Sequence, residues 1–386
     1  MEVPSNKLPY PHQPGPGEWG TPPTRIDDFL RWTFEQGISD VKITPTDPIA
    51  VRQQGMWKHV TSRVPSPVEI FTLIENMTRD AGTTAQLLRG SRVDFSYEIF
   101  VVPGERRSGS LRFRGNATST SDGNQGIGAA ITLRLIPGKL PTFEQTSTPK
   151  ELIDIMFPDN GLVLLSGVMG SGKTTLLAAG MRHIRTKLDK AVMTLEKPIE
   201  FDYTNIDDAR GTIEQIEIPR MIQSFSEGVI SSTRKAVDVL LVGEANDPET
   251  MEAAIHAAEI GIAVYATLHT SSVGSIIPRV IHQFPEGEQN GIAVSLISSL
   301  RVGVQQRLVP RVGGGRVALR EWLEFTEDHR NWLIEQDLHT IQGAVESLVQ
   351  KDGHPLMLDA EIAYGEGLID KSVYTRIKRE KESKKN

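Results

Sequence analysis

The residues from Gly167 to Thr174 have the types and spacing of a phosphate-binding loop. Their sequence, GVMGSGKT, fits the pattern G-x-x-x-x-G-K-[ST] without deviation. Glycines in such a loop let the backbone curl until its N–H groups point at a phosphate. We therefore expect Lys173 to reach the β- and γ-phosphates of a nucleoside triphosphate and Thr174 to hold Mg²⁺. The residues expected to contact the nucleotide here are Gly167, Val168, Met169, Gly170, Ser171, Gly172, Lys173, Thr174 and Thr175.

Hydrolysis of a triphosphate also needs groups that hold Mg²⁺, orient water and meet the charge of the transition state. Glu244 follows an apolar strand about seventy residues after the loop, and we expect it to activate water and to organise Mg²⁺. Glu196 and Glu200 follow another apolar segment, and His269 follows a third. His269 would sense the γ-phosphate through a hydrogen bond; the alternative is a structural histidine.

The elements around these residues alternate between apolar strands and helices, which is typical of a parallel sheet covered by helices. At the carboxyl edge of such a sheet, the loop and the acidic residues would meet. The expected strands are Leu162–Ser166, Ala191–Leu195, Ile213–Ile218, Val237–Val242, Ile262–Leu268 and Arg316–Phe325. The expected helices are Lys173–Leu188, Ile222–Lys235 and Pro248–Ile260, with a further helical region over Gly291–Leu308.

The chain before this region has a different organisation. Residues 1–23 are rich in Pro and Gly, which favours a disordered arm; the alternative is a segment that docks on a neighbour through Tyr10 and Trp19. The pattern of residues 24–136 predicts an α+β domain with a mainly antiparallel sheet, and residues 137–149 are expected to form a linker. Ser66 predicts a helix start with Pro67 at its first position and Glu69 closing a capping box.

The parallel-sheet domain is expected to span residues 150–325, followed by a helical unit over residues 326–386. From Lys371 onward the chain carries seven basic and two acidic side chains. This composition favours a frayed, solvated tail over a binding patch.

Composition limits the classes of function. The net charge of −7 argues against bulk electrostatic capture of nucleic acid, so nucleic acid is not expected as a direct ligand. The chain has no cysteine, which excludes disulfides and cysteine-based metal sites. No signal peptide and no long apolar run is visible, so we expect a cytoplasmic protein that reaches the inner membrane, if at all, through partners.

Several motifs, taken in order, resemble those of the secretion-ATPase superfamily of PilT-like and type IV secretion ATPases. The loop is similar to its Walker A motif, TLEKPIEF at Thr194–Phe201 to its aspartate box, DVLLVGE at Asp238–Glu244 to its Walker B motif, and ATLHTSSV at Ala266–Val273 to its histidine box. In the N-terminal half SDVKI, VDFSYE, RFRGNAT and LRLIP also resemble family segments. TAQLLRG at Thr84–Gly90 most resembles the DotB/TraJ branch of Dot/Icm-type and conjugative type IV secretion systems.

The resemblance implies an α/β fold in which a PAS-like N-terminal domain precedes a RecA-like P-loop domain, with ATP and Mg²⁺ as ligands. It further implies a homo-hexamer that works with inner-membrane and cytoplasmic components of a secretion system. Arg112, Arg114 and Arg134 match basic residues of the N-terminal domain that reach a nucleotide, and an ordinary solvated strand face is the alternative. Two positions depart from the family: Lys197 stands where the aspartate box has aspartate, and Asn246 stands where arginine is usual.

The function expected from these observations is an ATPase that couples ATP binding and hydrolysis to interdomain motion and powers a type IV secretion or conjugative apparatus. A PilT-like pilus motor and a RecA-like nucleic-acid translocase are the alternatives. A nucleotide-gated assembly factor with little turnover is a third, motivated by Lys197 and Asn246.

Overall fold

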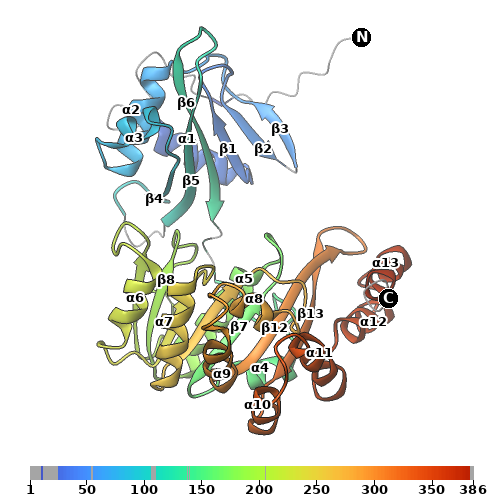
Figure 1. Ribbon diagram of the computed structural model, residues 1–386. Coiled ribbons are helices and arrows are strands. Elements are labelled where there is room, and N and C mark those ends of the chain that lie inside the picture. The colour runs from blue at the N-terminus through green and yellow to red at the C-terminus, as the bar shows by residue number, and fades with distance from the viewer. Residues whose placement is uncertain are drawn as a thin grey trace. The chain divides into compact units, whose positions relative to one another are not determined.

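The computed structural model describes residues 10–11, 25–53, 55–105, 110–136, 138, 140–204 and 206–382. The chain divides into two compact units, Met1–Lys139 and Leu140–Asn386 (Figure 1). Each unit is built around its own buried apolar core.

The N-terminal unit is one six-stranded sheet with helices packed against it. Its sheet has the strand order β3-β2-β1-β6-β5-β4, and every neighbouring pair is antiparallel, which confirms the α+β prediction. Its helices are α1 (Arg25–Glu35), α2 (Pro67–Thr78) and α3 (Thr83–Leu88). Its strands are β1 (Asp40–Ile43), β2 (Ala50–Gln53), β3 (Met56–His59), β4 (Val93–Phe100), β5 (Ser110–Ser121) and β6 (Ile127–Ile136).

Two details of this unit bear on the sequence predictions. The capping box at the start of α2 is confirmed, because Ser66 accepts from the Glu69 backbone and the Glu69 carboxylate accepts from the Ser66 backbone. Tyr10 is 3% exposed and packs edge-on against Phe29, so this anchor residue docks on its own unit. Trp19 and most of the predicted arm lie outside the described residues.

The C-terminal unit contains a seven-stranded sheet with the order β13-β12-β7-β11-β10-β8-β9. All neighbouring strands are parallel except β12 and β13, which form an antiparallel pair at one edge. The strands are β7 (Gly161–Ser166), β8 (Ala191–Glu196), β9 (Thr212–Glu217), β10 (Val239–Val242), β11 (Ala263–Leu268), β12 (Leu300–Pro310) and β13 (Arg316–Glu324). The predicted parallel α/β sheet is therefore confirmed.

Helices cover both faces of this sheet (Figure 1). Alternate residues of β7 enter different cores: Leu162 and Leu164 face one set of helices, and Val163 and Leu165 face the other. This two-sided burial explains why β7 reads as a continuous apolar run. The helices are α4 (Lys150–Ile155), α5 (Lys173–Lys187), α6 (Phe225–Ser232), α7 (Pro248–Glu259), α8 (Ile276–Ile281), α9 (Gln289–Ser299), α10 (Glu327–Ile334), α11 (Ile341–Asp352), α12 (Leu356–Gly365) and α13 (Lys371–Glu382).

The prediction of a helix over Gly291–Leu308 is only half right. Helix α9 ends at Ser299, and the chain continues as strand β12, which pairs in parallel with β7. A short apolar segment satisfies either geometry, and here the pairing with a strand distant in sequence decides it.

The C-terminal helices pack on the same unit as the sheet. Leu333 of α10 and Val345 of α11 belong to the core cluster that contains the centre of the sheet. Helices α12 and α13 cover β13 through a smaller cluster that includes Leu319, Ile369 and Ile377.

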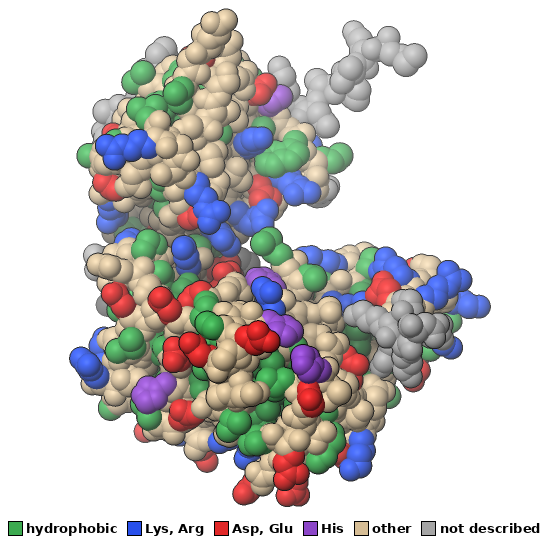
Figure 2. Space-filling model, in the orientation of Figure 1, with side chains coloured by type: hydrophobic (Ala, Val, Ile, Leu, Met, Phe, Trp, Pro, Cys, Tyr) green, Lys and Arg blue, Asp and Glu red, His purple; other side chains and the backbone are tan. Residues whose placement is uncertain are grey.

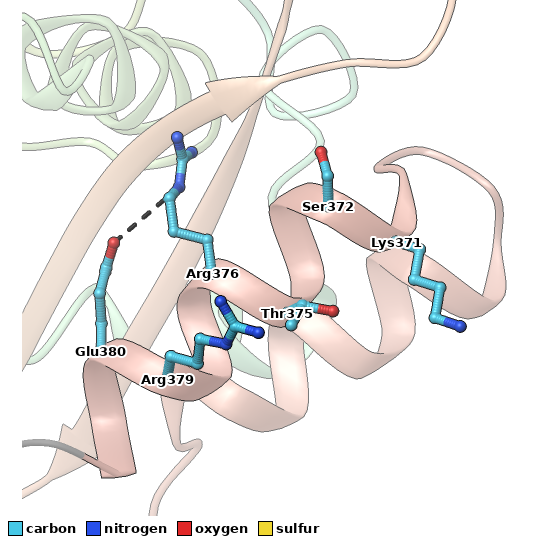
Figure 3. A pocket seen from close by; sticks show the side chains of 6 residues that line it. All are labelled: Lys371, Ser372, Thr375, Arg376, Arg379 and Glu380. Atoms are coloured by element: carbon cyan, nitrogen blue, oxygen red, sulfur yellow. Dashed lines mark ion pairs between the residues drawn. The ribbon is translucent and has the colours of Figure 1, made fainter.

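The prediction of a frayed tail from Lys371 is wrong for the described part, because Lys371–Glu382 is helical and buries Val373 and Ile377. An open hollow along α13 is lined by Lys371, Arg376, Arg379 and Glu380 together with two hydroxyl residues (Figure 3). Arg376 and Glu380 form an ion pair there at 3.9 Å. None of its lining residues lies in the phosphate loop.

Among the described residues, no helix is both long enough and apolar enough to cross a bilayer.

Candidate nucleotide-binding site

The phosphate loop connects the buried end of β7 to the first turn of α5. Gly172 is the residue before α5 and has φ +86, a left-handed conformation that glycine adopts without steric cost. At Gly167, a Cβ would come within 2.3 Å of the Gln306 carbonyl oxygen. Glycine at position 167 is therefore required by the close approach of β12, and the loop lies at the N-terminus of a helix, where backbone N–H groups favour anions.

Lys173 lies inside the loop. Its Nζ donates hydrogen bonds to the carbonyl oxygens of Gly167 at 2.7 Å and Val168 at 3.2 Å. Burial lowers the pKa of Lys173, and the charge of Glu244 opposes that shift. The loop therefore holds the Lys173 side chain within electrostatic reach of Glu244.

Polar groups of the loop fit a bound phosphate. The hydroxyl oxygen of Ser171 is buried and has no hydrogen-bond partner among the described residues. A buried hydroxyl without a partner is costly, and a phosphate oxygen is an acceptor suited to it. Thr174 is half-buried, whereas Thr175, Val168 and Met169 are exposed, Met169 to 89%. The loop thus combines a helix N-terminus, a buried lysine and an unsatisfied hydroxyl.

Glu244 lies at the same edge of the sheet, two residues beyond β10. Its position is fixed by the backbone around it, since Thr267 of β11 donates from its hydroxyl to the Gly243 carbonyl and accepts from the Ala245 amide. The Glu244 side chain is exposed, and its Oε2 accepts a hydrogen bond from Asn246 Nδ2 at 3.2 Å. Asn246, where the resemblance leads one to expect arginine, is therefore a neutral partner of the candidate catalytic carboxylate.

Glu196, at the end of β8, is 5% exposed. Its carboxylate accepts from Thr194 at 2.7 Å, from Gln215 at 3.2 Å and from the Glu200 backbone at 3.3 Å. Burial nevertheless raises the pKa of Glu196 from 4.5 to about 7, with the neighbouring Glu200 adding to the shift. Lys197, the other departure from the family pattern, is exposed and forms no part of this buried cluster.

His269 follows β11 directly and lies against the loop. Its Nδ1 is 3.3 Å from the Gly167 carbonyl oxygen, the same oxygen that Lys173 contacts. Three strand ends therefore converge on the loop. Ser166 of β7 pairs with Leu268 of β11, and Val242 of β10 pairs with both Ala266 of β11 and Leu195 of β8.

The three arginines expected to reach a nucleotide belong to the N-terminal unit. Arg114 and Arg134 are direct cross-strand partners on β5 and β6, and Arg112 lies on the same face of β5. Arg112 pairs with Glu98 at 3.2 Å, and Arg134 pairs with the buried Asp40 at 2.7 Å. Lys and Arg side chains are visible on the surface of this unit in Figure 2.

Two further residues beside the loop, Gln306 and Arg320, are not among the site residues predicted from the sequence. Both are buried, and Gln306 donates from Nε2 to the carbonyl oxygen of Ser171 in the loop at 2.8 Å. The two residues, with Gly172 and Thr175, line a cavity of about 210 Å³ beside the start of α5. The available signal was a charged pair, Arg320–Glu321, inside an otherwise apolar strand.

The acidic residues of the site do not by themselves form a metal cage. In the described parts of the chain, no cluster of three or more His, Asp or Glu side chains is arranged to hold a metal ion. The chemistry of Thr174 and Glu244 still fits Mg²⁺, because both carry side-chain oxygens and this ion usually takes one or two protein ligands together with water and substrate phosphates.

Comparison with known proteins identifies related chains. Residues 127–345 match the family model described as Type II/IV secretion system protein. The type IV pilus retractation ATPase PilT of Pseudomonas aeruginosa is 31% identical over 322 residues, which cover 83% of this chain and 89% of that protein.

Solved structures with the same architecture also carry related sequences. The Legionella pneumophila ATPase DotB superposes with a TM-score of 0.86 and 34% identity, covering 95% of this chain and 97% of that chain. The pilus retraction motor PilT with bound ADP superposes with a TM-score of 0.77 and 29% identity, covering 90% and 95%. These matches confirm the RecA-like fold and the placement near the PilT-like and DotB branch.

Proposed function

The chain belongs to the Type II/IV secretion system protein family, and on this premise we propose that it binds and hydrolyses ATP at the loop Gly167–Thr174. The observation that carries the proposal is the convergence of Lys173, Glu244 and His269 on one loop, whose buried Ser171 hydroxyl has no partner in the described part of the chain. The ADP bound to a related motor supports the same ligand class here.

Each side chain has a distinct task in this proposal. The loop amides and Lys173 bind the phosphates, because helix N-termini and buried cations favour anions. The exposed carboxylate of Glu244 orients water and accepts its proton, and the hydrogen bond from Asn246 holds this carboxylate in place. His269 would donate to the γ-phosphate from the ring nitrogen that does not face Gly167, since its Nδ1 lies against the Gly167 carbonyl oxygen. Thr174 and Glu244 would hold Mg²⁺, which would supply charge neutralisation at the phosphates.

Glu196 acts indirectly, from a buried position at the end of β8. Its backbone lies next to Gly243, since a Cβ on Gly243 would approach the Glu196 Cα at 3.5 Å. A group whose pKa is about 7 exchanges its proton at neutral pH, so Glu196 tunes the charge behind Glu244 as the site cycles. The Glu200 backbone N–H donates a hydrogen bond to the Glu196 carboxylate, which holds the backbone of this segment in place.

Arg112, Arg114 and Arg134 provide positive charge from the N-terminal unit. Arginines brought to a triphosphate by domain closure neutralise the charge of the transition state. We propose that ATP binding closes the two units and that hydrolysis and release reopen them. In a homo-hexamer, this motion would drive a type IV secretion or conjugative apparatus, a role supported by the extent of the similarity to DotB.

The first test is ATP binding and turnover by the purified protein. Lys173→Ala removes the buried cation, and we expect it to abolish ATP binding while the protein stays folded. Lys187→Ala is the matched control, because Lys187 is an exposed lysine at the other end of the same helix. Equal ATP affinity in the two variants would refute the assignment of the loop. Mass measurement in solution with and without ATP tests the hexamer.

A pilus motor is the second candidate, favoured by the 31% identity to PilT over most of both chains. The Lys173→Ala variant, expressed in its own cells, separates the two roles. Loss of secretion or conjugative transfer with normal twitching supports our proposal, and the reverse pattern supports the pilus motor. Stimulation of ATP turnover by DNA, with salt-dependent binding, would instead support a nucleic-acid translocase.

A further inference from the structure

Gln306 and Arg320 form a buried polar pair behind the phosphate loop. They are directly opposite each other on the antiparallel strands β12 and β13. Gln306 is 3% exposed and Arg320 is 1% exposed. Arg320 Nε donates to Gln306 Oε1 at 2.7 Å, so the arginine fixes which end of the glutamine amide faces the loop.

The other end of the Gln306 amide holds one peptide group of the loop. Gln306 Nε2 donates to the Ser171 carbonyl oxygen at 2.8 Å. That carbonyl belongs to the same planar peptide as the N–H of Gly172, and in a trans peptide the C=O and N–H point in opposite directions. A glutamine that holds the Ser171 oxygen on the β12 side therefore turns the Gly172 N–H away from β12, toward the interior of the loop.

Space also favours this arrangement. A Cβ at position 172 would come within 2.9 Å of Gln306 Nε2, so the glutamine amide rests against the backbone of the loop. The contact leaves the Ser171–Gly172 peptide little freedom to flip while Gln306 stays in place.

Arg320 uses its remaining donors on a third segment. One terminal nitrogen donates to the Thr146 carbonyl oxygen at 2.7 Å, and the other donates to the Ser147 carbonyl oxygen at 2.9 Å. These carbonyls close a single helical turn in which the Thr146 amide bonds to Thr142 and Ser147 has a left-handed φ of 47°. Carbonyl groups at the end of a helical turn have no partner within the turn, and a cation is a favourable one.

The guanidinium of Arg320 makes all of these hydrogen bonds to neutral oxygens. Asp359, the nearby carboxylate, instead accepts from the Arg320 backbone amide at 2.8 Å. Burial lowers the pKa of Arg320 to about 10. Burying a cation costs free energy, and an apolar side chain would fill the same volume without that cost. Packing alone therefore does not explain an arginine at this position.

We propose that Gln306 positions the Ser171–Gly172 peptide for phosphate binding, and that Arg320 acts through Gln306 and couples the loop to the turn at residues 142–148. The inference rests on the proposed function, because it assigns positioning residues to that same nucleotide site. The turn follows directly on the N-terminal unit in the chain, so the relay Ser147–Arg320–Gln306–Ser171 joins the phosphate loop to the segment by which that unit is attached.

The first test uses two substitutions of Gln306. Gln306→Glu keeps the acceptor for Arg320 but loses the donor to Ser171, and Gln306→Met loses both without adding charge. We expect both variants to raise the Kd for ATP by about 10-fold or more. Without the Gln306 donor, the peptide orientation that binds phosphate leaves the buried Ser171 carbonyl without a hydrogen bond, which costs free energy. Wild-type affinity in both folded variants would overturn the proposal.

The matched control is Leu319→Ala, which creates a cavity beside Arg320 on the same strand. It lowers the stability of the unit without touching the relay, so its Tm falls while its Kd for ATP stays at the wild-type value. If Leu319→Ala weakened ATP binding as much as Gln306→Met, the effect would be general destabilisation and the proposal would fail.

The second test asks whether Arg320 acts through Gln306. Arg320→Met alone is expected to weaken ATP binding, and to weaken it no further when combined with Gln306→Met. If Arg320→Met does not fold, Arg320→Lys is measured instead. Lysine keeps the positive charge but lacks the guanidinium group that bridges Gln306 to the turn. Independent, multiplicative losses of affinity would overturn the relay.

Hydrogen exchange gives a readout that a merely structural role would not move. ATP should slow amide exchange at residues 142–148 in the wild type and leave it unchanged in Gln306→Met at saturating ATP, since coupling between two sites is reciprocal. Equal protection in both proteins would contradict the coupling. Should the wild type show no ATP binding that depends on Lys173, the proposed function fails instead, which distinguishes the two failures.

Discussion

Asn246 donates a hydrogen bond from its side-chain amide to the carboxylate of Glu244 at 3.2 Å. The bond holds the candidate catalytic base with a neutral donor where the family resemblance leads one to expect a cation. It also makes Asn246 part of the site, although sequence comparison alone marks it only as a departure.

Replacing this donor by an acid should slow hydrolysis. In Asn246→Asp a second carboxylate would face Glu244, which disfavours the charged form of the base and disturbs its orientation. We expect kcat for ATP to fall about 10-fold with a smaller change in KM. Asn290→Asp, an exposed asparagine of α9 that undergoes the same charge change, is the control. A kcat for Asn246→Asp equal to that of the control would show that the contact has no role.

His269 should discriminate between ATP and ADP. Its ring lies against the Gly167 carbonyl, and its proposed partner is the γ-phosphate, which ADP lacks. We expect His269→Ala to lower kcat by about 100-fold to 1,000-fold, on the order of one lost transition-state donor, while the Kd for ADP stays constant. His282→Ala, at an exposed histidine, should change neither quantity. A parallel loss of ADP affinity would mean that His269 only supports the loop.

Glu196 should make the stability of the C-terminal unit depend on pH. Its pKa is 4.5 in an ordinary environment and about 7 in the fold, so the folded state binds the proton more tightly than the unfolded state. Its contribution is therefore full below about pH 4.5 and is lost as pH rises through about 7, by at most about 3 kcal/mol.

Urea unfolding between pH 5 and pH 8 tests this assignment. Glu196→Gln has no proton to exchange, and its stability should fall less between these pH values than that of the wild type. Glu151→Gln, at an exposed glutamate of α4, should keep the wild-type pH dependence. Identical pH profiles for wild type and Glu196→Gln would rule out Glu196 as the group that titrates.

Much of the site could be predicted because its signals are local in sequence. The loop Gly167–Thr174 is fixed by glycine, lysine and threonine at set spacings, and the strand before it is apolar because both of its faces are buried. Glu244 and His269 could be placed beside it since parallel strands present their carboxyl ends at one edge.

Gln306 and Arg320 could not be found in this way because their contacts are not local. The sequence pattern predicts the end of a helix for the segment that contains Gln306, and this segment becomes a strand only through pairing with β7, far away in sequence. The interaction between Gln306 and Arg320 then depends on the register of β12 against β13, for which no single segment carries a signal. Helix α13 could not be predicted from the sequence either, because its basic residues outnumber Val373 and Ile377, the apolar residues of its buried face.

The central claim is that this chain is an ATPase in which Glu244 activates water at the phosphate loop. The most direct measurement compares ATP binding and single-turnover hydrolysis by the purified wild type and Glu244→Gln. We expect the wild type to hydrolyse bound ATP, and Glu244→Gln to bind ATP with similar affinity while the rate falls 100-fold or more, as for the loss of a general base. Hydrolysis by Glu244→Gln at the wild-type rate would contradict the account.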